Sequence, residues 1–426
     1  MFRQDPSFLL PWVGWVGDIA TANPQRRCYV VSNDWLLGHF SNLTFSQKFA
    51  ISARDALQAH GFRRLRYAKD RVGRAARSNG SLEARLREIA SHAKPSVVIS
   101  FTENEALKAS FPGALVLYTE LGYLPRLGAP ETMFLDPCGH QTGLLVVAWD
   151  RLARMEPPLS TGLSEDLWEA HLQATLREHP AHEAARHWVR ELRPRRIRLL
   201  ALQPLDWLTY EGLYGPVHPE ELIYREASRQ PDALLVPAYH PGHRLSPDME
   251  KYISGEFPNV VFPPRELSSG LAELFVPYVD EVVTISSTVA MAGILVGKPV
   301  RTLGRSAFRR AAAAMTKVQG DLAAQSRLRR NLLAFLSNRY LHLKARLTGE
   351  SGYASDVVSQ IPRADPVDHY FDFSDWTVER LVALLGLGST VPLAVAPAAL
   401  GTPPADLHRS GGPIEQVSRS PSTSFA

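Results

Sequence analysis

The feature that most constrains the fold is a series of short apolar runs that alternate with helical patterns. The second half of the chain holds five of them: RIRLLALQ from Arg196, ALLVPAYHP from Ala233, NVVFPP from Asn259, DEVVTISS from Asp280 and KPVRTLG from Lys298. Runs this short and this rich in Val, Leu and Ile, with helices between them, predict parallel strands whose two faces are both covered. The second half is therefore expected to be α/β.

The first half shows the same alternation. Its strand-like runs are RCYVVS (27–32), PSVVIS (95–100) and ALVLYTELGY (114–123), with GLLVVAW (143–149) as a candidate fourth strand. Two Rossmann-like domains in tandem are the expected result. Ligands of such sheets bind beyond the carboxyl ends of the strands, so polar residues at strand ends are the candidate site.

The domain boundaries follow from composition and helix signals. We expect an N-terminal Rossmann-like domain (1–160), a helical connector (161–194), a C-terminal Rossmann-like domain (195–310), further helices (311–387) and a disordered tail (388–426). The connector begins like a capped helix at Ser164 and is interrupted at Pro180. In the tail, Pro, Ala, Ser and Gly dominate and periodicity disappears, which is typical of disorder.

Composition excludes several classes of protein. The net charge of +4 over 426 residues is too small to indicate nucleic-acid binding. Cys28 and Cys138 are the only cysteines, which fits a reducing compartment, and no CxxC pair or HExxH helix suggests a metal. No apolar run approaches the roughly 18 residues that span a bilayer, so a cytoplasmic protein is expected. The basic stretch 63–87 is either a solvated helix face or a surface attracted to anionic lipid.

Three consecutive hydroxyl residues stand where a predicted strand becomes a helix, in DEVVTISSTVAMAGILVGKPV (280–300). The first N–H groups of a helix lack intrahelical partners, and Ser286, Ser287 and Thr288 add hydroxyl donors, so this junction suits a phosphate. The alternative is that one serine only caps the helix. Gly293 predicts that the helix lies close against the sheet.

A second polar cluster follows the strand of ALLVPAYHPGHR. Pro241 restricts His240 to an extended conformation, which directs its imidazole out of the strand end. With His243 and Arg244 it forms a set of donors for a phosphate or carboxylate. The alternative is a surface turn with incidental basic residues.

Weaker candidates stand at two other strand ends. Gln203 precedes a proline and closes the strand of LALQPLDW, where an ordinary strand end explains it equally well. Glu120, in LYTELGYLPR, could take a proton from an acceptor hydroxyl or stabilise charge on a sugar; it could also cap the next turn or pair with Arg126. Asp136 is a second candidate carboxylate.

Together these motifs resemble bacterial capsule polysaccharide biosynthesis proteins, a group that includes Kdo transferases of the two-domain GT-B type. The resemblance is carried by Gln203-Pro204, His240-Pro241, and the triplet 286–288 followed by Gly-Lys-Pro-Val (297–300); in the first domain Glu-Leu-Gly-Tyr (120–123) and Leu-Asp-Pro (135–137) are similar to that group's segments. The His-Pro and Ser-Ser/Thr pair is also similar to that of sialyl- and polysialyltransferases and of enzymes that polymerise CDP-linked polyol phosphates.

The resemblance implies a cytoplasmic, metal-independent glycosyltransferase that uses a CMP-activated donor, Kdo- or sialic-acid-like, and a capsule polysaccharide or lipid-linked acceptor. It implies that His240 contacts the CMP phosphate beside residues 286–288, that Gln203 lines the donor pocket, and that Glu120 is the catalytic carboxylate. It also leaves room for peripheral association with the membrane or the capsule machinery.

This chain departs from the family pattern at Leu121, where retaining Kdo transferases have a second acidic residue, and at Gly139-His140-Gln141. Two alternatives therefore stay open. One is a polyol-phosphate transferase that attacks at phosphorus. The other is a GT-B scaffold without catalysis that takes part in capsule assembly.

Overall fold

The structure of the chain is a computed structural model. It describes residues 21, 27–33, 37–38, 45–51, 80–100, 103, 105–140, 142–156, 163–203, 218–241, 244–304 and 306–387. The predicted tail, Pro204 and His243 lie outside these residues. The domain boundaries predicted at 160, 194 and 310 stay predictions, because the residues up to Gly386 form one compact unit.

The first half of the chain forms a two-stranded sheet and a four-stranded sheet. Its elements are β1 (Tyr29–Asn33), β2 (Gln47–Ile51), α5 (Gly80–Ala93), β3 (Val97–Ser100), α6 (Glu105–Ser110), β4 (Leu115–Leu121), β5 (Thr132–Asp136), α7 (Leu144–Val147), α8 (Trp149–Arg154), α9 (Ser164–Glu178) and α10 (His182–Glu191). β1 and β2 pair in parallel, and the larger sheet has the order β10-β5-β4-β3. Only β3 and β4 are parallel there, so this sheet is mixed.

The strand predicted at 143–149 is wrong, because this stretch forms α7 and the start of α8. Leu144, Leu145 and Val146 are all buried. A helical turn that is apolar on every side gives the same continuous apolar run as a buried strand, so periodicity does not separate the two. The preceding stretch forms strand β5 instead.

The second half contains the parallel sheet that the sequence predicted. Its elements are β6 (Ile197–Ala201), α11 (Pro219–Arg229), β7 (Leu234–Ala238), α12 (Pro247–Glu256), η2 (Arg265–Leu267), α13 (Ala272–Phe275), η3 (Val276–Tyr278), β8 (Glu281–Thr284), α14 (Val289–Val296) and β9 (Val300–Thr302). The strand order is β7-β6-β8-β9, parallel throughout. The run NVVFPP contributes only a bridge, from Val260 to Leu235.

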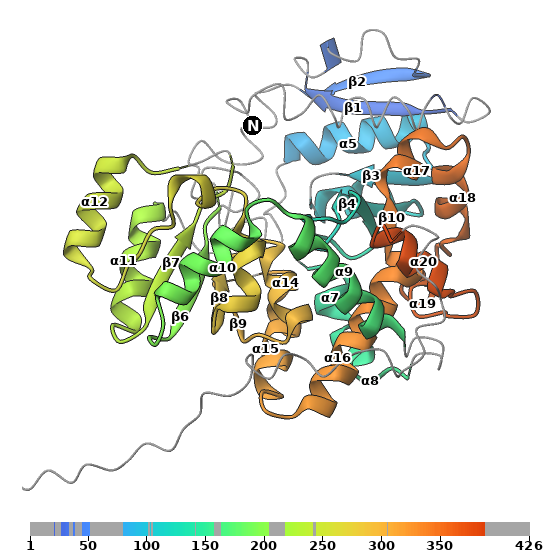
Figure 1. Ribbon diagram of the computed structural model, residues 1–426. Coiled ribbons are helices and arrows are strands. Elements are labelled where there is room, and N and C mark those ends of the chain that lie inside the picture. The colour runs from blue at the N-terminus through green and yellow to red at the C-terminus, as the bar shows by residue number, and fades with distance from the viewer. Residues whose placement is uncertain are drawn as a thin grey trace, which may run out of the picture. The chain divides into compact units, whose positions relative to one another are not determined.

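Helix α14 lies against β8 and β9 (Figure 1), as Gly293 predicted. A Cβ atom at Gly293 would stand 2.7 Å from Cγ2 of Val300, closer than packed carbon atoms allow, and in tight contact with Cγ2 of Val282 at 3.2 Å. The helix ends at Gly297, whose φ of 80° is left-handed and favours glycine. The close packing at Gly293 thus fixes α14 against β8 and β9.

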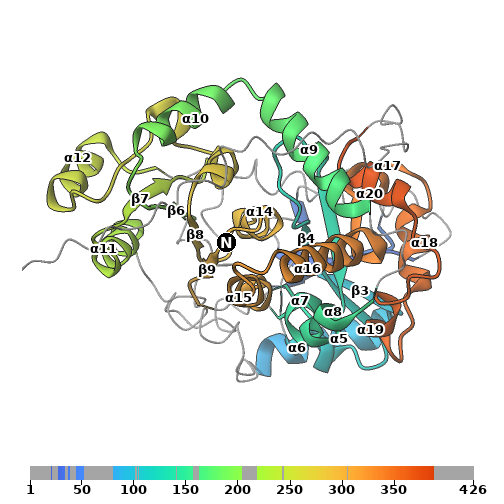
Figure 2. The same cartoon turned by 60° about the horizontal axis from the view of Figure 1, so that its bottom comes forward.

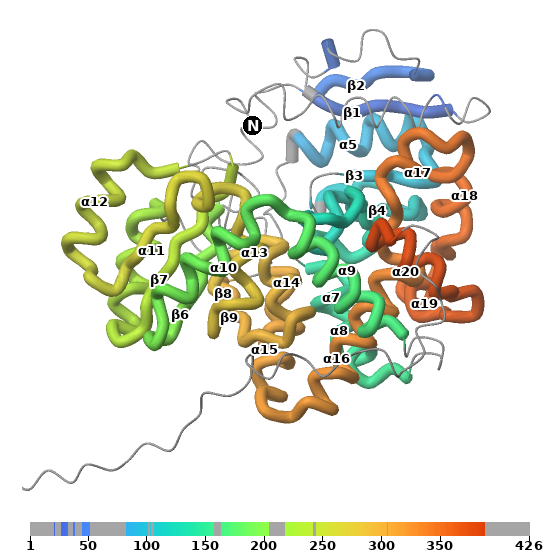
Figure 3. Tube along the Cα trace, in the orientation of Figure 1, coloured from blue at the N-terminus to red at the C-terminus, as the bar shows by residue number. Residues whose placement is uncertain are grey.

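The remaining described residues form helices and one short strand, which is added to the edge of the first sheet. The helices are α15 (Arg309–Lys317), α16 (Leu322–Phe335), the π-helical turn η4 (Leu336–Tyr340), α17 (Lys344–Gly349), α18 (Tyr353–Gln360), α19 (Pro366–His369) and α20 (Val378–Leu384), with the short strand β10 (Leu341–Leu343) between η4 and α17. α16 packs against α8 and α9 (Figure 2), and α10 packs against α13 (Figure 3). No helix in the described ranges is long and apolar enough to cross a bilayer. The predicted α/β fold class is confirmed, with a mixed sheet in the first half, a fully parallel sheet in the second half and helices after them.

Candidate active site

The register of the parallel sheet aligns three of the predicted site residues. Ala201 of β6 pairs with Ala238 of β7 on one side and with Thr284 of β8 on the other. Gln203, His240 and Ser286 each lie two residues beyond this aligned set, at the carboxyl ends of adjacent strands. The structure therefore brings the amide, the imidazole and the first hydroxyl to one edge of the sheet, where α/β proteins bind ligands.

Gln203 is tied to the neighbouring strand end. Its side chain is buried, and Oε1 accepts a hydrogen bond from the N–H of Ser286 at 2.7 Å. The hydroxyl of Thr284, which is completely buried, donates to the carbonyl of Ala201 at 3.0 Å and lies 3.4 Å from the same Oε1. Gln203 thus supports the strand-to-helix junction, and the place in the donor pocket that the family resemblance implies for it stays a prediction.

Residues 286–288, called here the hydroxyl turn, donate two of their three backbone N–H groups to side chains at the ends of β6 and β8, the first of them to Gln203. The N–H of Ser287 donates to the hydroxyl of Thr284 at 3.3 Å. Ser287 in turn accepts the N–H of Val289 on its hydroxyl at 3.3 Å and the N–H of Ala290 on its carbonyl at 3.0 Å. Within the described part of the chain, the N–H of Thr288 makes no hydrogen bond. Among the described residues, the turn therefore offers an anion one backbone donor and the half-buried hydroxyls of Ser287 and Thr288, fewer amides than the sequence predicted.

The backbone that leads to His240 is fixed on both sides. The N–H of Tyr239 donates to the carbonyl of Ser268 at 2.7 Å, and the N–H of Gly270 donates to the carbonyl of Tyr239 at 3.0 Å. Gly270 has a φ of +74°, and a Cβ atom there would stand 3.2 Å from Cγ of Pro241. His240 is half-buried at the end of this paired segment.

Arg244 is engaged with other groups. Its Nε donates to a carboxylate oxygen of Glu250 at 3.2 Å, and its guanidinium carbon lies 5.6 Å from the ring centre of Tyr239. Its positive charge is therefore already balanced by Glu250 within the described residues. Of the predicted basic cluster, His240 is the member that the register places beside Gln203.

Glu120 lies at the end of β4. Its side chain is half-buried, and burial raises the pKa of its carboxyl group, against the opposing effects of the Leu121 N–H, which donates to Oε1 at 3.1 Å, and of the Arg126 charge. A carboxyl group with a raised pKa is a better proton acceptor once ionised, which suits a general base. This environment is compatible with the catalytic role that the family resemblance implies.

Asp136, the second candidate carboxylate, is completely buried. Its oxygens accept hydrogen bonds from the N–H groups of Cys138 at 2.7 Å, Gly139 at 3.3 Å and Leu144 at 2.7 Å, and from the hydroxyl of Tyr340 at 2.9 Å. Burial raises its pKa to about 6 although all four donors favour the charged form. With its oxygens occupied by four donors, Asp136 fits a structural role, and Glu120 is the better candidate for chemistry.

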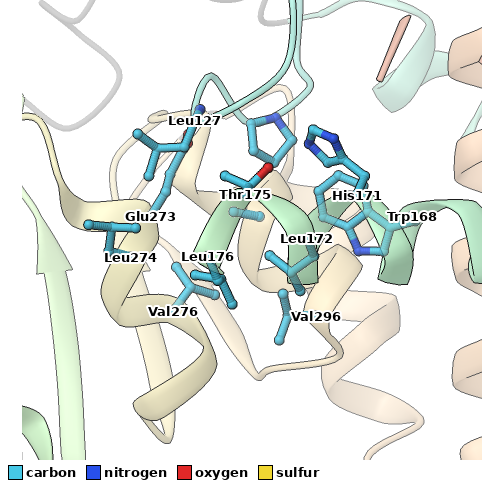
Figure 4. Close-up of a pocket in the computed structure, with 12 residues that line it drawn as sticks. Leu127, Trp168, His171, Leu172, Thr175, Leu176, Glu273, Leu274, Val276 and Val296 are labelled. Atoms are coloured by element: carbon cyan, nitrogen blue, oxygen red, sulfur yellow. The ribbon is translucent and has the colours of Figure 1, made fainter. Parts of the chain in front are cut away.

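An apolar hollow lies apart from these residues. Figure 4 shows Leu172, Leu176 and Val296 among the side chains that line it, together with Glu273. None of the residues predicted for the nucleotide site lines it. Its relevance to the site is indirect: Glu273 accepts the N–H groups of Arg126 and Leu127 at 3.2 and 3.0 Å, and so anchors the loop that follows Glu120.

Sequence reasoning missed Thr284. Thr284 interrupts the apolar run Val282-Val283-Ile285, and a single polar residue inside such a run was the available sign of a buried, hydrogen-bonded hydroxyl. A hydroxyl that is completely buried must find hydrogen-bond partners, and in this sheet it finds the carbonyl of Ala201 and the N–H of Ser287.

Comparisons with known proteins give weak similarities. No known protein family and no curated protein matches the sequence. Among solved structures, the β-Kdo 2,7 transferase of Thermosulfurimonas dismutans KpsC is 15% identical with a TM-score of 0.35, and the match covers 72% of this chain and 90% of that one. The β-Kdo 2,4 transferase of the same KpsC is 17% identical with a TM-score of 0.27, covering 50% and 69%.

A UDP-GlcNAc 2-epimerase from Neisseria meningitidis, bound to UDP-GlcNAc, is 10% identical with a TM-score of 0.25, and the match covers 82% of this chain and 97% of that one. Because these similarities are weak, the function proposed below rests on the residues of the site.

Proposed function

We propose that this chain is a glycosyltransferase that moves a sugar from a CMP-activated, Kdo- or sialic-acid-like donor to a polysaccharide or lipid-linked acceptor. The observation that carries the proposal is the alignment of Gln203, His240 and Ser286 at the carboxyl edge of one parallel sheet. The imidazole at the end of β7 and the hydroxyl turn at the end of β8, with β6 alone between them in the sheet order, can act together on one anionic group.

The chemistry assigned to the second half is stabilisation of the leaving group. When the bond between sugar and phosphate breaks, negative charge grows on the CMP phosphate. His240 donates a hydrogen bond to that phosphate, and the hydroxyl turn with the N–H of Thr288 adds further donors. Donors that are already in place when charge develops lower the barrier, because they need no reorganisation.

The chemistry assigned to the first half is activation of the acceptor. Glu120 accepts a proton from the acceptor hydroxyl as that oxygen attacks the sugar. Burial favours this role because it raises the pKa of the Glu120 carboxyl group. No metal is required by this scheme, since His240 and the turn supply the positive and hydrogen-bonding groups.

A thermal-shift screen of the full chain against CMP, CDP, UDP and GDP, each with its sugar conjugates, tests the proposal. A ligand at a concentration of about 100 times its dissociation constant should stabilise the folded state by about 2.7 kcal/mol. We expect cytidine nucleotides to stabilise the chain most. A response to UDP or GDP alone would reject the CMP-linked donor.

Product analysis separates the proposal from its alternatives. A sugar transferase that hydrolyses its donor slowly should release CMP and free sugar. Release of CMP with a polyol or sugar phosphate would instead support attack at phosphorus, and binding of CMP without turnover would support the scaffold alternative. The scaffold alternative is tested because Leu121 stands where the family pattern has an acidic residue.

A further inference from the structure

The hydroxyl turn is held by two side chains that lie outside it. Gln203 reaches it from the end of β6, and Thr284 reaches it from the end of β8. Both side chains are buried, with exposures of 4% and 0%. Buried polar groups of this kind are costly unless they are hydrogen-bonded, so their orientation is fixed by the bonds they make.

The chemistry of each bond fixes its direction. A backbone N–H can only donate, so the group that Gln203 presents to Ser286 must be the carbonyl oxygen of its amide, and Nε2 lies on the other side of the group. The hydroxyl of Thr284 is used twice: it donates to the carbonyl of Ala201 and accepts the N–H of Ser287. Turning the amide of Gln203 or the hydroxyl of Thr284 the other way would therefore break at least one of these hydrogen bonds.

Among the described residues, these bonds leave one backbone donor in the turn. The N–H groups of Ser286 and Ser287 donate to the side chains of Gln203 and Thr284, respectively. The next two residues after Thr288 donate their N–H groups to the hydroxyl and the carbonyl of Ser287. The N–H of Thr288 remains, together with the hydroxyls of Ser287 and Thr288.

We propose that Gln203 and Thr284 are positioning residues, which hold the hydroxyl turn so that the N–H of Thr288 and the hydroxyls of Ser287 and Thr288 form a ready-made phosphate site. The inference rests on the proposed function, because the phosphate is that of the CMP-linked donor. It goes further than the proposed function because it assigns to Gln203 the role of orienting the hydroxyl turn, instead of contacting the sugar or the base of the donor.

Four variants test it in the full chain. Gln203→Met keeps the side-chain length and removes the acceptor, and Thr284→Val keeps the shape and removes the hydroxyl. Thr284→Ser keeps the hydroxyl and should behave as wild type. Thr316→Val is the matched control, because the Thr316 hydroxyl also donates to a backbone carbonyl, that of Ala312 at 2.9 Å, in a helix away from the sheet edge.

The dissociation constants of CMP, cytidine and inorganic pyrophosphate are then measured for each protein. We expect Gln203→Met and Thr284→Val to weaken the binding of CMP and pyrophosphate by about tenfold or more, because a turn that is no longer held in place loses at least one well-placed hydrogen bond to the charged phosphate. Cytidine, which has no phosphate, should bind these variants as it binds wild type. A purely structural role would instead weaken CMP and cytidine equally, and would overturn the inference.

Amide hydrogen exchange of the ligand-free chain supplies a second readout. Ser286 and Ser287 should be protected in wild type and should lose protection in Gln203→Met and Thr284→Val, respectively. Unchanged exchange together with unchanged CMP binding would overturn the inference.

Failure of the proposed function is separable from failure of the inference. If wild type binds pyrophosphate but not CMP, the CMP-linked donor is rejected and the positioning roles are judged on pyrophosphate alone. If wild type binds neither, the phosphate site itself is rejected, and the inference falls with it.

Discussion

Tyr340 donates its hydroxyl proton to Oδ2 of Asp136 at 2.9 Å, across 204 residues of chain. The same carboxylate gathers N–H groups from the loop that follows β5, so a single buried side chain joins the first sheet to the π-helical turn η4. Gly143 is part of this arrangement, because a Cβ atom there would stand 2.5 Å from Oδ2 of Asp136.

Replacement of Asp136 by Asn should lower the free energy of unfolding by about 2–3 kcal/mol, because an amide nitrogen would then face a backbone donor that has no other acceptor. Tyr340→Phe removes one donor only and should cost about 1 kcal/mol. Urea denaturation of the three proteins measures both effects. Equal stability of wild type and Asp136→Asn would contradict the structural role assigned to Asp136.

The sheet of the second half could be predicted because its strands are short runs of Val, Leu and Ile with clear helices between them. β6, β7 and β8 all stand where the sequence placed them. The first sheet was harder to predict. β5 lies in a stretch flanked by polar residues. β10 is three residues long, and its partner β5 precedes it by some 200 residues in the chain. No local pattern reports such a pairing.

The candidate site was predictable as a set of strand ends but not as a network. The motifs identified Gln203, His240 and the hydroxyl turn, and parallel topology placed them at one edge. What Gln203 does depends on the register of β6 against β8, which brings Oε1 to the N–H of Ser286. Register is set by packing over the whole sheet, so the roles of Gln203 and Thr284 could be assigned only from the structure.

Replacement of His240 by Ala should abolish transfer and weaken CMP binding by about 1–3 kcal/mol, since a charge-assisted hydrogen bond to the phosphate is lost. Isothermal titration with CMP and a turnover assay measure the two effects. His187→Ala is a suitable control, because His187 is exposed on α10 and faces Glu191. Full activity of His240→Ala would show that the donor site lies elsewhere.

Replacement of Glu120 by Gln should lower kcat by at least about 100-fold while it changes the dissociation constant of CMP little, because a general base acts only on the chemical step. Steady-state kinetics and titration with CMP separate these quantities. Glu131→Gln is the matched control: Glu131 is an exposed carboxylate just before β5 whose partner is Lys344 at 2.6 Å. A change in CMP affinity with unchanged kcat would remove Glu120 from the catalytic step.

His342 gives the stability of the chain a predictable dependence on pH. Burial lowers the pKa of His342 from its ordinary 6.5 to about 4, so the unfolded chain binds a proton below pH 6.5 that the folded chain resists until about pH 4. The stabilising contribution is therefore complete above pH 6.5 and is lost as the pH falls towards 4, a loss of about 3 kcal/mol.

The variant His342→Phe keeps an aromatic ring beside Tyr353 but cannot titrate, so its free energy of unfolding should fall less than that of wild type between pH 6.5 and pH 4. His369, whose pKa burial also lowers to about 4, contributes equally to both proteins and cancels in the comparison. Urea denaturation at a series of pH values gives the difference directly. Parallel curves for the two proteins would mean that the imidazole of His342 takes up its proton in the folded state as readily as in the unfolded chain, which a ring sealed from water cannot do.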